Sequence, residues 1–547
     1  MNDLNQQSLT SGNKLQKDLI AGLVVFLVAL PLCLGIALAS DAPLASGLLA
    51  GIIGGLVVGS ISGSSTSVSG PAAGLTAIVS AQIAALGSFE AFVTAVFLAG
   101  IIQIAMGCMK AGALSAFFPS SVIKGLLAAI GTILILKQLI YFFGGDRENF
   151  ETSFDIPGLE ILKDTYTIFE GNLQPGPLFV GILCISLLII WPRISFLKKT
   201  PLPPALAAVV LGVILQFAMS SMGEGWAITE DQRVNVPSLF DNSAAEGADE
   251  ATAADIAANS DKEGGKQEKW FVFPGFLSGD FSVLAGMQVY IAAITIAIVA
   301  SLETLLNLEA VDKLDPQKRP SPPSRELIAQ GIGNSVGGLI GSLPVTSVII
   351  RSSVNIHVGA ETKKSTIFHG ILLVLSVAVF ATYLNYIPFT SLAAILLMTG
   401  WKLANPKLFR SLWKMGARQF APFLITLVAI VFTDLLLGVV IGMVVSLLFV
   451  MVSTAAKPFT SDESIDNDGT VRLVLAQQVS FLSRFTIKKK LAAIAPNSTV
   501  VFDGTQNEFI DEDTLEMIAD YIKESAEGGI VATAEGLDLP TESTGLH

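Results

Sequence analysis

Apolar runs long enough to cross a lipid bilayer recur along this chain between residues 17 and 455. The first covers residues 18–40, and a second follows almost at once at residues 45–59. Because a transmembrane helix needs roughly 20 mainly apolar residues, this part of the chain has room for about 12–14 spans. The sequence therefore predicts a polytopic α-helical membrane protein.

The composition excludes several other classes of protein. Hydrophobic residues make up 52% of the 547 positions and charged residues only 14%, against roughly 25% charged in soluble domains. The formal net charge of −13 argues against a nucleic-acid partner, which needs a basic surface. The three cysteines and three histidines lack the spacing of metal ligands, so we expect neither a metal site nor a cofactor.

Three regions differ in character along the chain. Residues 1–16 form a short polar N-terminus, residues 17–455 form the membrane domain, and residues 460–547 return to soluble composition. An acidic segment at 222–280 interrupts the membrane domain. We expect it to be an extracytoplasmic loop without a packed core.

Basic residues indicate the orientation in the membrane. They cluster in short loops, for example at 193–199, 313–325 and 402–418. The positive-inside rule places these loops in the cytoplasm. Counting spans then places the N- and C-termini on the cytoplasmic side of a cell membrane, which we expect to be a bacterial inner membrane.

The tail has the pattern of a small α/β domain. Residues 470–476 alternate apolar and polar side chains as a strand does, and 499–503 predict a second strand. Residues 511–522 predict a helix with an acidic start, and 529–533 a third strand.

Two segments inside the membrane domain are rich in small residues and contain proline. Residues 63–74 and 341–348 each precede a resumed helical pattern. Irregular backbone at membrane depth is tolerated only where it is buried in protein or lines a cavity, and paired interrupted segments are typical of transporter binding sites. Two half-helices starting there would direct free N–H groups at an anion. The alternative is that the small residues merely allow close helix packing.

Three polar residues add to this pattern. Glu303 is a carboxylate within a spanning run, and Asn307 follows it by one turn on the same face. A buried carboxyl group could carry a proton or, when ionised, bind a hard cation. Arg351 follows the second interrupted segment and could attract anions or pair with Glu303. The alternatives are that Glu303 reaches towards water and that Arg351 anchors a helix end at the interface.

Together these segments resemble the SulP family of anion transporters, the sulfate permease and bicarbonate transporter relatives of solute carrier family 26. The tail resembles a short STAS domain through residues 500–503 and 509–511. The resemblance to the transporter family rests on residues 21–31, 69–76, 301–306, 325–334, 343–346 and 351–355.

The resemblance implies a seven-plus-seven inverted repeat, in which a core domain moves against a gate domain in an elevator-like cycle, followed by a cytoplasmic STAS domain. It places the anion between the third and tenth helices. The implied binding residues are Leu30, Ala72, Ala73, Ser347, Val348, Ile349 and Arg351.

The resemblance also gives Glu303 a coupling role. Family members carry an acidic residue there, and those similar to sodium–bicarbonate symporters carry Asp, with Thr one turn later. This chain has Glu303 and Asn307. Sodium symport, proton symport and anion exchange therefore stay open.

We expect secondary active transport of a small inorganic oxyanion, bicarbonate or sulfate, by a homodimer in the lipid bilayer. A nucleobase or organic-anion permease of the same fold is the alternative, but residues 348–350 are apolar and offer no hydrogen bond to a base. An enzyme is not expected, because His357 and His369 have no Cys or Asp close by in the sequence.

Overall fold

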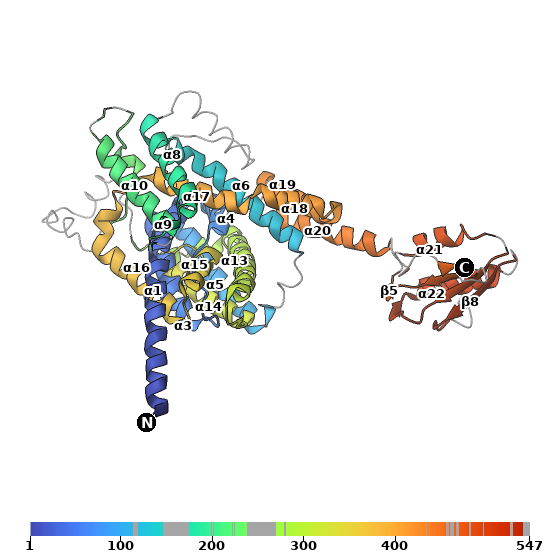
Figure 1. Ribbon diagram of the computed structural model, residues 1–547. Coiled ribbons are helices and arrows are strands. Elements are labelled where there is room, and N and C mark those ends of the chain that lie inside the picture. The colour runs from blue at the N-terminus through green and yellow to red at the C-terminus, as the bar shows by residue number, and fades with distance from the viewer. Residues whose placement is uncertain are drawn as a thin grey trace. The chain divides into compact units, whose positions relative to one another are not determined.

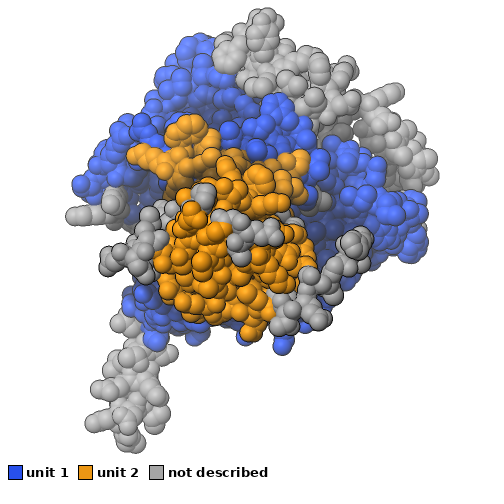
Figure 2. All heavy atoms as spheres, turned by 90° about the vertical axis from the view of Figure 1, so that its right-hand side faces the viewer, with its two compact units in different colours: residues 1–412, 423–440 blue, residues 413–422, 441–547 orange. Residues whose placement is uncertain are grey.

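The chain forms two compact units, which Figure 2 colours separately: residues 1–412 with 423–440, and residues 413–422 with 441–547. Residues 238–269, most of the predicted acidic loop, lie outside the described part. The computed structural model describes residues 2–112, 119–145, 174–198, 200, 202–220, 222–223, 225–237, 270–277, 281–433, 435–455, 459, 464–465, 470–480, 483–495, 497–525 and 529–539.

Among the described residues, seven helices are long and apolar enough to cross a membrane. They are α1 (Asn2–Ala39), the continuous run of α2 (Leu44–Ile53), η1 (Gly54–Val58) and α3 (Gly59–Ile61), α5 (Phe89–Cys108), α6 (Ser120–Phe142), α8 (Pro175–Ile190), α13 (Met287–Leu314) and α16 (Lys364–Leu384).

Shorter helices complete the membrane domain (Figure 1). They are η2 (Ala73–Leu75) with α4 (Thr76–Leu86), α10 (Pro204–Met219), α14 (Pro323–Ile340), α15 (Ile349–Val358), α17 (Phe389–Leu403), α19 (Ala417–Phe432) and α20 (Leu435–Ala455). The first seven segments, α1 to α10, and the second seven, α13 to α20, form the predicted seven-plus-seven inverted repeat.

Two short strands stand at equivalent places in the two halves. β1 (Ser69–Pro71) precedes η2 and α4, and β2 (Val345–Ser347) precedes α15. The strands pair antiparallel, so α4 and α15 leave the pair in opposite directions.

The helices of the first unit pack in two groups. In what we call the core group, α5 packs on α13 and α14, and α1 packs on α2, α15 and α16. In the gate group, α17 packs on α6, α8 and α10. The groups meet where α1 contacts α10 and α17 and where α4 contacts α6.

Local sequence explains the tight turn between α4 and α5. Gly87 ends α4 with φ of 72°, a left-handed conformation that costs glycine little. Ser88 then caps α5, because its side chain accepts a hydrogen bond from the amide of Ala91 at 3.2 Å.

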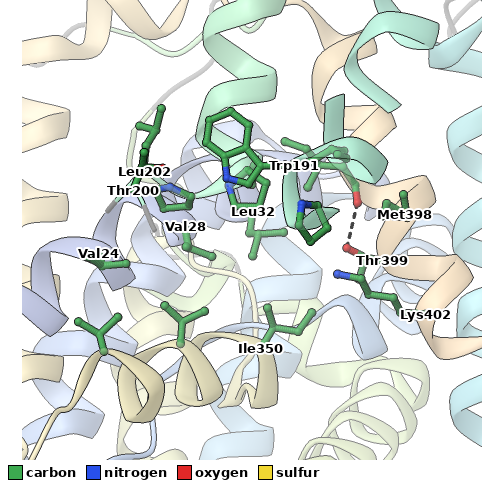
Figure 3. A pocket seen from close by; sticks show the side chains of 18 of the residues that line it. Val24, Val28, Leu32, Trp191, Thr200, Leu202, Ile350, Met398, Thr399 and Lys402 are labelled. Atoms are coloured by element: carbon green, nitrogen blue, oxygen red, sulfur yellow. Dashed lines mark hydrogen bonds between the residues drawn. The ribbon is translucent and has the colours of Figure 1, made fainter. Parts of the chain in front are cut away.

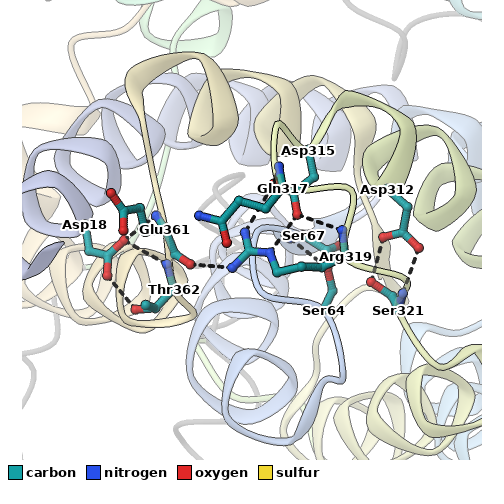
Figure 4. A network of polar contacts seen from close by, with 10 residues as sticks. All are labelled: Asp18, Ser64, Ser67, Asp312, Asp315, Gln317, Arg319, Ser321, Glu361 and Thr362. Atoms are coloured by element: carbon teal, nitrogen blue, oxygen red, sulfur yellow. Dashed lines mark hydrogen bonds and ion pairs between the residues drawn. The ribbon is translucent and has the colours of Figure 1, made fainter.

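A polar network ties the loops of the core group together (Figure 4). Arg319 Nε donates to Asp315 Oδ2 at 2.7 Å, and Arg319 Nη1 donates to the carbonyl of Glu361 at 2.8 Å. Asp18 in the middle of α1 accepts from the amides of Glu361 at 2.8 Å and Thr362 at 3.0 Å. The α13–α14 and α15–α16 connections are thus joined to α1.

Six short helices lie in the described parts of the connections. η6 (Glu230–Gln232) and η8 (Gly275–Leu277) lie in the described ends of the acidic segment. The amide of Val236 in this segment donates to Asn385 Oδ1 at 2.8 Å. The others are η5 (Trp191–Arg193) with α9 (Ser195–Lys198), α12 (Ser282–Ala285) and α18 (Pro406–Lys414).

The tail forms a four-stranded sheet in the order β3-β4-β6-β8, in which β4, β6 and β8 are parallel. Leu473, Phe502 and Ile518 lie in its apolar core. The predicted strands and helix are present; α21, β3, β5 and β7 were not predicted. The bounds are β3 (Ser464–Ile465), β4 (Val471–Val474), β5 (Gln478–Val479), α21 (Arg484–Leu491), β6 (Thr499–Asp503), β7 (Phe509–Ile510), α22 (Glu512–Glu524) and β8 (Val531–Glu535).

Asp503 at the end of β6 gives the tail an acid-sensitive contact. Hydrogen bonds from Thr505, followed by the Arg472 guanidinium at 2.9 Å, hold the pKa of Asp503 below its usual range. A carboxyl group with a lowered pKa stabilises the fold above its unfolded pKa, and this contribution is lost as the pH falls through the folded pKa.

We therefore expect Asp503→Asn to destabilise the tail by about 1 kcal/mol at neutral pH. The difference from the parent protein should close as the pH falls through the lowered pKa of Asp503. Hydrogen exchange of β6 peptides in the full chain, corrected for intrinsic rates, measures this. The exposed Asp538 provides the control Asp538→Asn, which should match the parent at both pH values. An equal loss of protection at low and neutral pH for Asp503→Asn would contradict the assignment.

Candidate functional site

The two interrupted segments meet in the strand pair β1–β2. Ser69 pairs with Ser347, Gly70 with Thr346 and Pro71 with Val345, and all six residues are buried. The side-chain oxygens of Ser67 and Ser347 are 2.7 Å apart. The pair therefore joins the two halves of the membrane domain through backbone and hydroxyl groups.

The helices that follow the strands start without side-chain caps. The N-cap residue of η2, which leads into α4, is Ala72, and the N-cap of α15 is Val348; neither side chain accepts a hydrogen bond from its helix. An apolar N-cap leaves the first N–H groups of a helix without an intrahelical partner. The two N-termini, at opposite ends of the strand pair, can therefore donate to an anion.

One face of α14 holds the strand pair in place. Glu326, Gln330 and Asn334 recur every fourth residue and are fully buried. Asn334 Oδ1 accepts from the amide of Val345 at 2.6 Å, and its Nδ2 donates to the carbonyl of the same residue at 3.1 Å. Gln330 Nε2 donates to Ser69 Oγ at 2.7 Å. These amides satisfy polar groups that water would satisfy outside a membrane.

One face of α13 contacts the chain where it leaves β1 and where it leaves β2. Asn307 Nδ2 donates to the carbonyl of Ser347 at 2.7 Å, and Thr304 Oγ1 accepts from the Ser347 amide at 3.3 Å. The Glu303 carboxyl group lies against Gly74, so a Cβ at Gly74 would collide with it. Glu303 Oε2 is buried and has no hydrogen-bond partner. A carboxylate at this position faces the first turn of η2 and α4, where a helix favours negative charge.

Arg351 lies behind the strand pair. Its guanidinium is fully buried, contacts the backbone of Gly70, and donates from Nη2 to Cys33 Sγ at 3.4 Å. Its Nε and Nη1 have no hydrogen-bond partner. The ion pair with Glu303 that the sequence left open is absent from the described contacts, since Glu303 Oε2 has no partner.

A cavity of about 480 Å³ separates the core group from the gate group. Figure 3 shows Val24 and Ile350 on one wall and Trp191 and Leu202 on the other, with Lys402 at one side. The core wall comes from α1 and α15, and the gate wall from α8, η5, the start of α10 and α17. Apart from Lys402, the residues that line it carry no charge.

The structure brings most of the predicted site residues to one place. Ala72, Ala73, Ser347, Val348 and Ile349 all lie at the two exits of the strand pair. Their role in binding stays a prediction.

Leu30, the predicted site residue on α1, is not among the residues that line the cavity. The side chains of α1 that line the cavity are those of Val24, Val28 and Leu32, whereas Leu30 lies about 200° around the helix from Val28. The part of Leu30 in anion binding stays a prediction.

Sequence reasoning missed the residues that hold the strands. Gln330 and Asn334 stood in the motif at 325–334, and their spacing of four together with Glu326 was the available signal. Thr304 carried no such signal. In the described part of the chain, no group of three or more His, Cys, Asp or Glu side chains is arranged to hold a metal ion.

Replacing Asn334 tests the support of the strand pair. Asn334→Leu keeps the branching at Cγ but leaves the Val345 amide and carbonyl without their partner, so we expect a loss of about 2–4 kcal/mol of stability. Thermal unfolding of the purified protein measures this. The matched control is Ser335→Ala on the same helix, because Ser335 Oγ makes no hydrogen bond; equal effects of the two variants would contradict the assigned role.

Several known proteins are similar to this chain in sequence and in fold. The model of the sulfate permease family matches residues 15–429. The putative sulfate transporter YvdB of Bacillus subtilis is 26% identical over 436 residues, which cover 80% of this chain and 73% of that protein. The bicarbonate transporter BicA of Synechocystis is 26% identical over 541 residues, which cover 94% of this chain and 87% of that protein.

A solved structure shares the fold at low identity. The murine Solute Carrier 26 family member A9 in its inward-facing state superposes with a TM-score of 0.67 at 16% identity, over 95% of this chain and 85% of that chain. The family consists of multi-pass membrane transporters. With its family model matched over most of its length, this chain belongs to the sulfate permease family.

Proposed function

We propose that this protein is a secondary active transporter that moves a small inorganic oxyanion, bicarbonate or sulfate, across the membrane. The observation that carries the proposal is the pair of buried helix starts at Ala72 and Val348, both without side-chain caps. Free N–H groups and the positive ends of two helix dipoles favour an anion without a cationic side chain. The named relatives, a sulfate and a bicarbonate transporter, support the same substrate class.

The arrangement of the two helix groups supports alternating access. The core group carries both half-helices, and the cavity separates it from the gate group on one side. We propose that the core group moves as a unit against the gate group, in an elevator-like cycle, and carries the anion with it. The network around Arg319 and Asp18 keeps the core group together at the cavity end.

The position of basic residues supports an inward-open orientation. The cavity lies beside Arg193 at the end of η5 and Lys402 at the end of α17. The positive-inside rule places these helix ends in the cytoplasm. We therefore propose that the cavity opens to the cytoplasm and that both termini lie there. The homodimer, the bacterial inner membrane and the STAS identity of the tail stay predictions.

Glu303 is our candidate for coupling. Its carboxyl group is buried against Gly74 and has an unpartnered oxygen, so a proton or a sodium ion can satisfy it. Asn307, by contrast, is engaged with the carbonyl of Ser347. We propose that Glu303 takes up the driving cation and that Asn307 holds β2.

Placing a negative charge at the second helix start tests the anion site. Val348→Asp should weaken anion binding by about a hundredfold or more, because two like charges about 5 Å apart repel by roughly 3 kcal/mol at an effective dielectric constant near 20. Val348→Asn has the same size without the charge and is the control. Uptake of labelled bicarbonate and of labelled sulfate into proteoliposomes measures both; uptake by the Asp variant at the parent level would move the site elsewhere.

Glu303→Gln tests the coupling. The substitution keeps the shape of the side chain but removes the group that binds a cation, so accumulation driven by a proton or sodium gradient should disappear. Exchange of labelled for unlabelled anion should persist, because the half-helices remain. Gradient-driven accumulation at the parent rate would leave Glu303 without a coupling role.

A further inference from the structure

Three polar side chains meet at the end of the membrane domain opposite the cavity. Lys137 on α6 donates to Asp41 Oδ2 at 2.9 Å and to Ser80 Oγ at 2.5 Å. Ser80 Oγ in turn donates to Asp41 Oδ2. We call these three residues the Lys137 cluster.

The Lys137 cluster joins the two helix groups. Asp41 follows α1 and Ser80 lies on α4, both in the core group, whereas α6 belongs to the gate group. Helix α4 contacts α6 here, and η2 contacts it as well (Figure 1). An ion pair between these groups has to break if they slide past each other.

The position of the cluster is set by the direction of the helices. The amide of Gln174, before α8, donates to the carbonyl of Phe143, after α6, at 3.3 Å. The end of α6 near Lys137 therefore meets the start of α8. The cavity is lined by Leu188 and Trp191 at the other end of α8, about 20 Å further along the helix.

The cluster also covers the candidate anion site from that side. Ser80 lies on α4, roughly 10 Å of helix beyond the uncapped start at Ala73. The Lys137 side chain is only 7% exposed and that of Asp41 29%. A lysine is rarely buried to this degree without a partner.

Backbone strain marks the same place. Asp41 has φ of 52°, a left-handed conformation that is uncommon outside glycine and tolerated best by Asn and Asp. Such conformations persist where surrounding contacts hold them, and they concentrate at sites that move or bind. The contacts to Lys137 and Ser80 supply part of that restraint.

We propose that the Lys137 cluster is the closed gate on the face opposite the cavity: it holds the inward-open state and must separate in every transport cycle. The inference rests on the alternating access proposed above. It assigns Asp41, Ser80 and Lys137 a role in the transport cycle that does not involve touching the bound anion. Weakening the cluster shifts the protein away from the state in which the cavity is open.

The test measures how accessible the cavity is. In the full chain, Cys108→Ser removes the exposed thiol and Met398→Cys places a reporter on the cavity wall. The rate at which a water-soluble maleimide labels this reporter in purified protein then follows the open state. Lys137→Met and Asp41→Asn should each lower the rate by about fivefold or more, the usual scale of coupling between two states.

Three further variants complete the design. The exchanged pair Asp41→Lys with Lys137→Asp should restore the parent rate, and Lys124→Met on the same helix should leave it unchanged. Ser80→Ala keeps both charges of the cluster and should slow labelling less than Lys137→Met or Asp41→Asn does. If Lys137→Met does not fold, the labelling rate of Ser80→Ala tests the proposal. Unchanged rates in the Lys137, Asp41 and Ser80 variants would overturn the proposal, as would an exchanged pair that stays slow while each single variant is slow.

The labelling needs no substrate, so the two proposals fail separately. If the parent protein takes up no oxyanion but the cluster variants show the expected changes in labelling rate, the proposed substrate is wrong and the proposed gate stands. Normal uptake with unchanged rates would remove the gate alone.

Discussion

Pairing of two short extended segments inside a membrane domain is the constraint on which the rest of this structure depends. In the hydrocarbon interior, an unpaired backbone group costs several kcal/mol. β1 and β2 satisfy part of that need through each other, and Gln330, Asn334, Thr304 and Asn307 satisfy much of the remainder. The first N–H groups of the two half-helices have no side-chain cap, and on our proposal they bind the anion.

On this proposal, backbone groups bind the anion and the site needs no cationic side chain. The arginine nearest in sequence, Arg351, is buried behind Gly70 and contacts Cys33, where it adds positive potential without lining the cavity. The residues at the helix starts are apolar, so they neither cap the helices nor compete with an anion. Glu303 lies close enough to link cation uptake to the same helix start.

The membrane fold and the family could be predicted from the sequence, because spanning runs and the motifs around Pro71 and Pro344 depend on local patterns; both predictions are confirmed. The face of α1 that lines the cavity could not be predicted, because Leu30 and Leu32 look alike in an apolar run. The hydrogen-bond partners of Asn334 and Lys137 could not be predicted from the sequence either. Asp41 and Lys137 lie 96 residues apart, and the packing of α1 and α4 on α6 brings them together.

The central claim, that backbone groups of two half-helices hold the anion, is tested most directly by a high-resolution map of the protein saturated with the anion that it transports. The account predicts density within hydrogen-bond distance of the N–H groups that follow Ala72 and Val348, with no lysine or arginine nitrogen in contact. Anion density held by Lys402 in the cavity, with both helix starts empty, would contradict it.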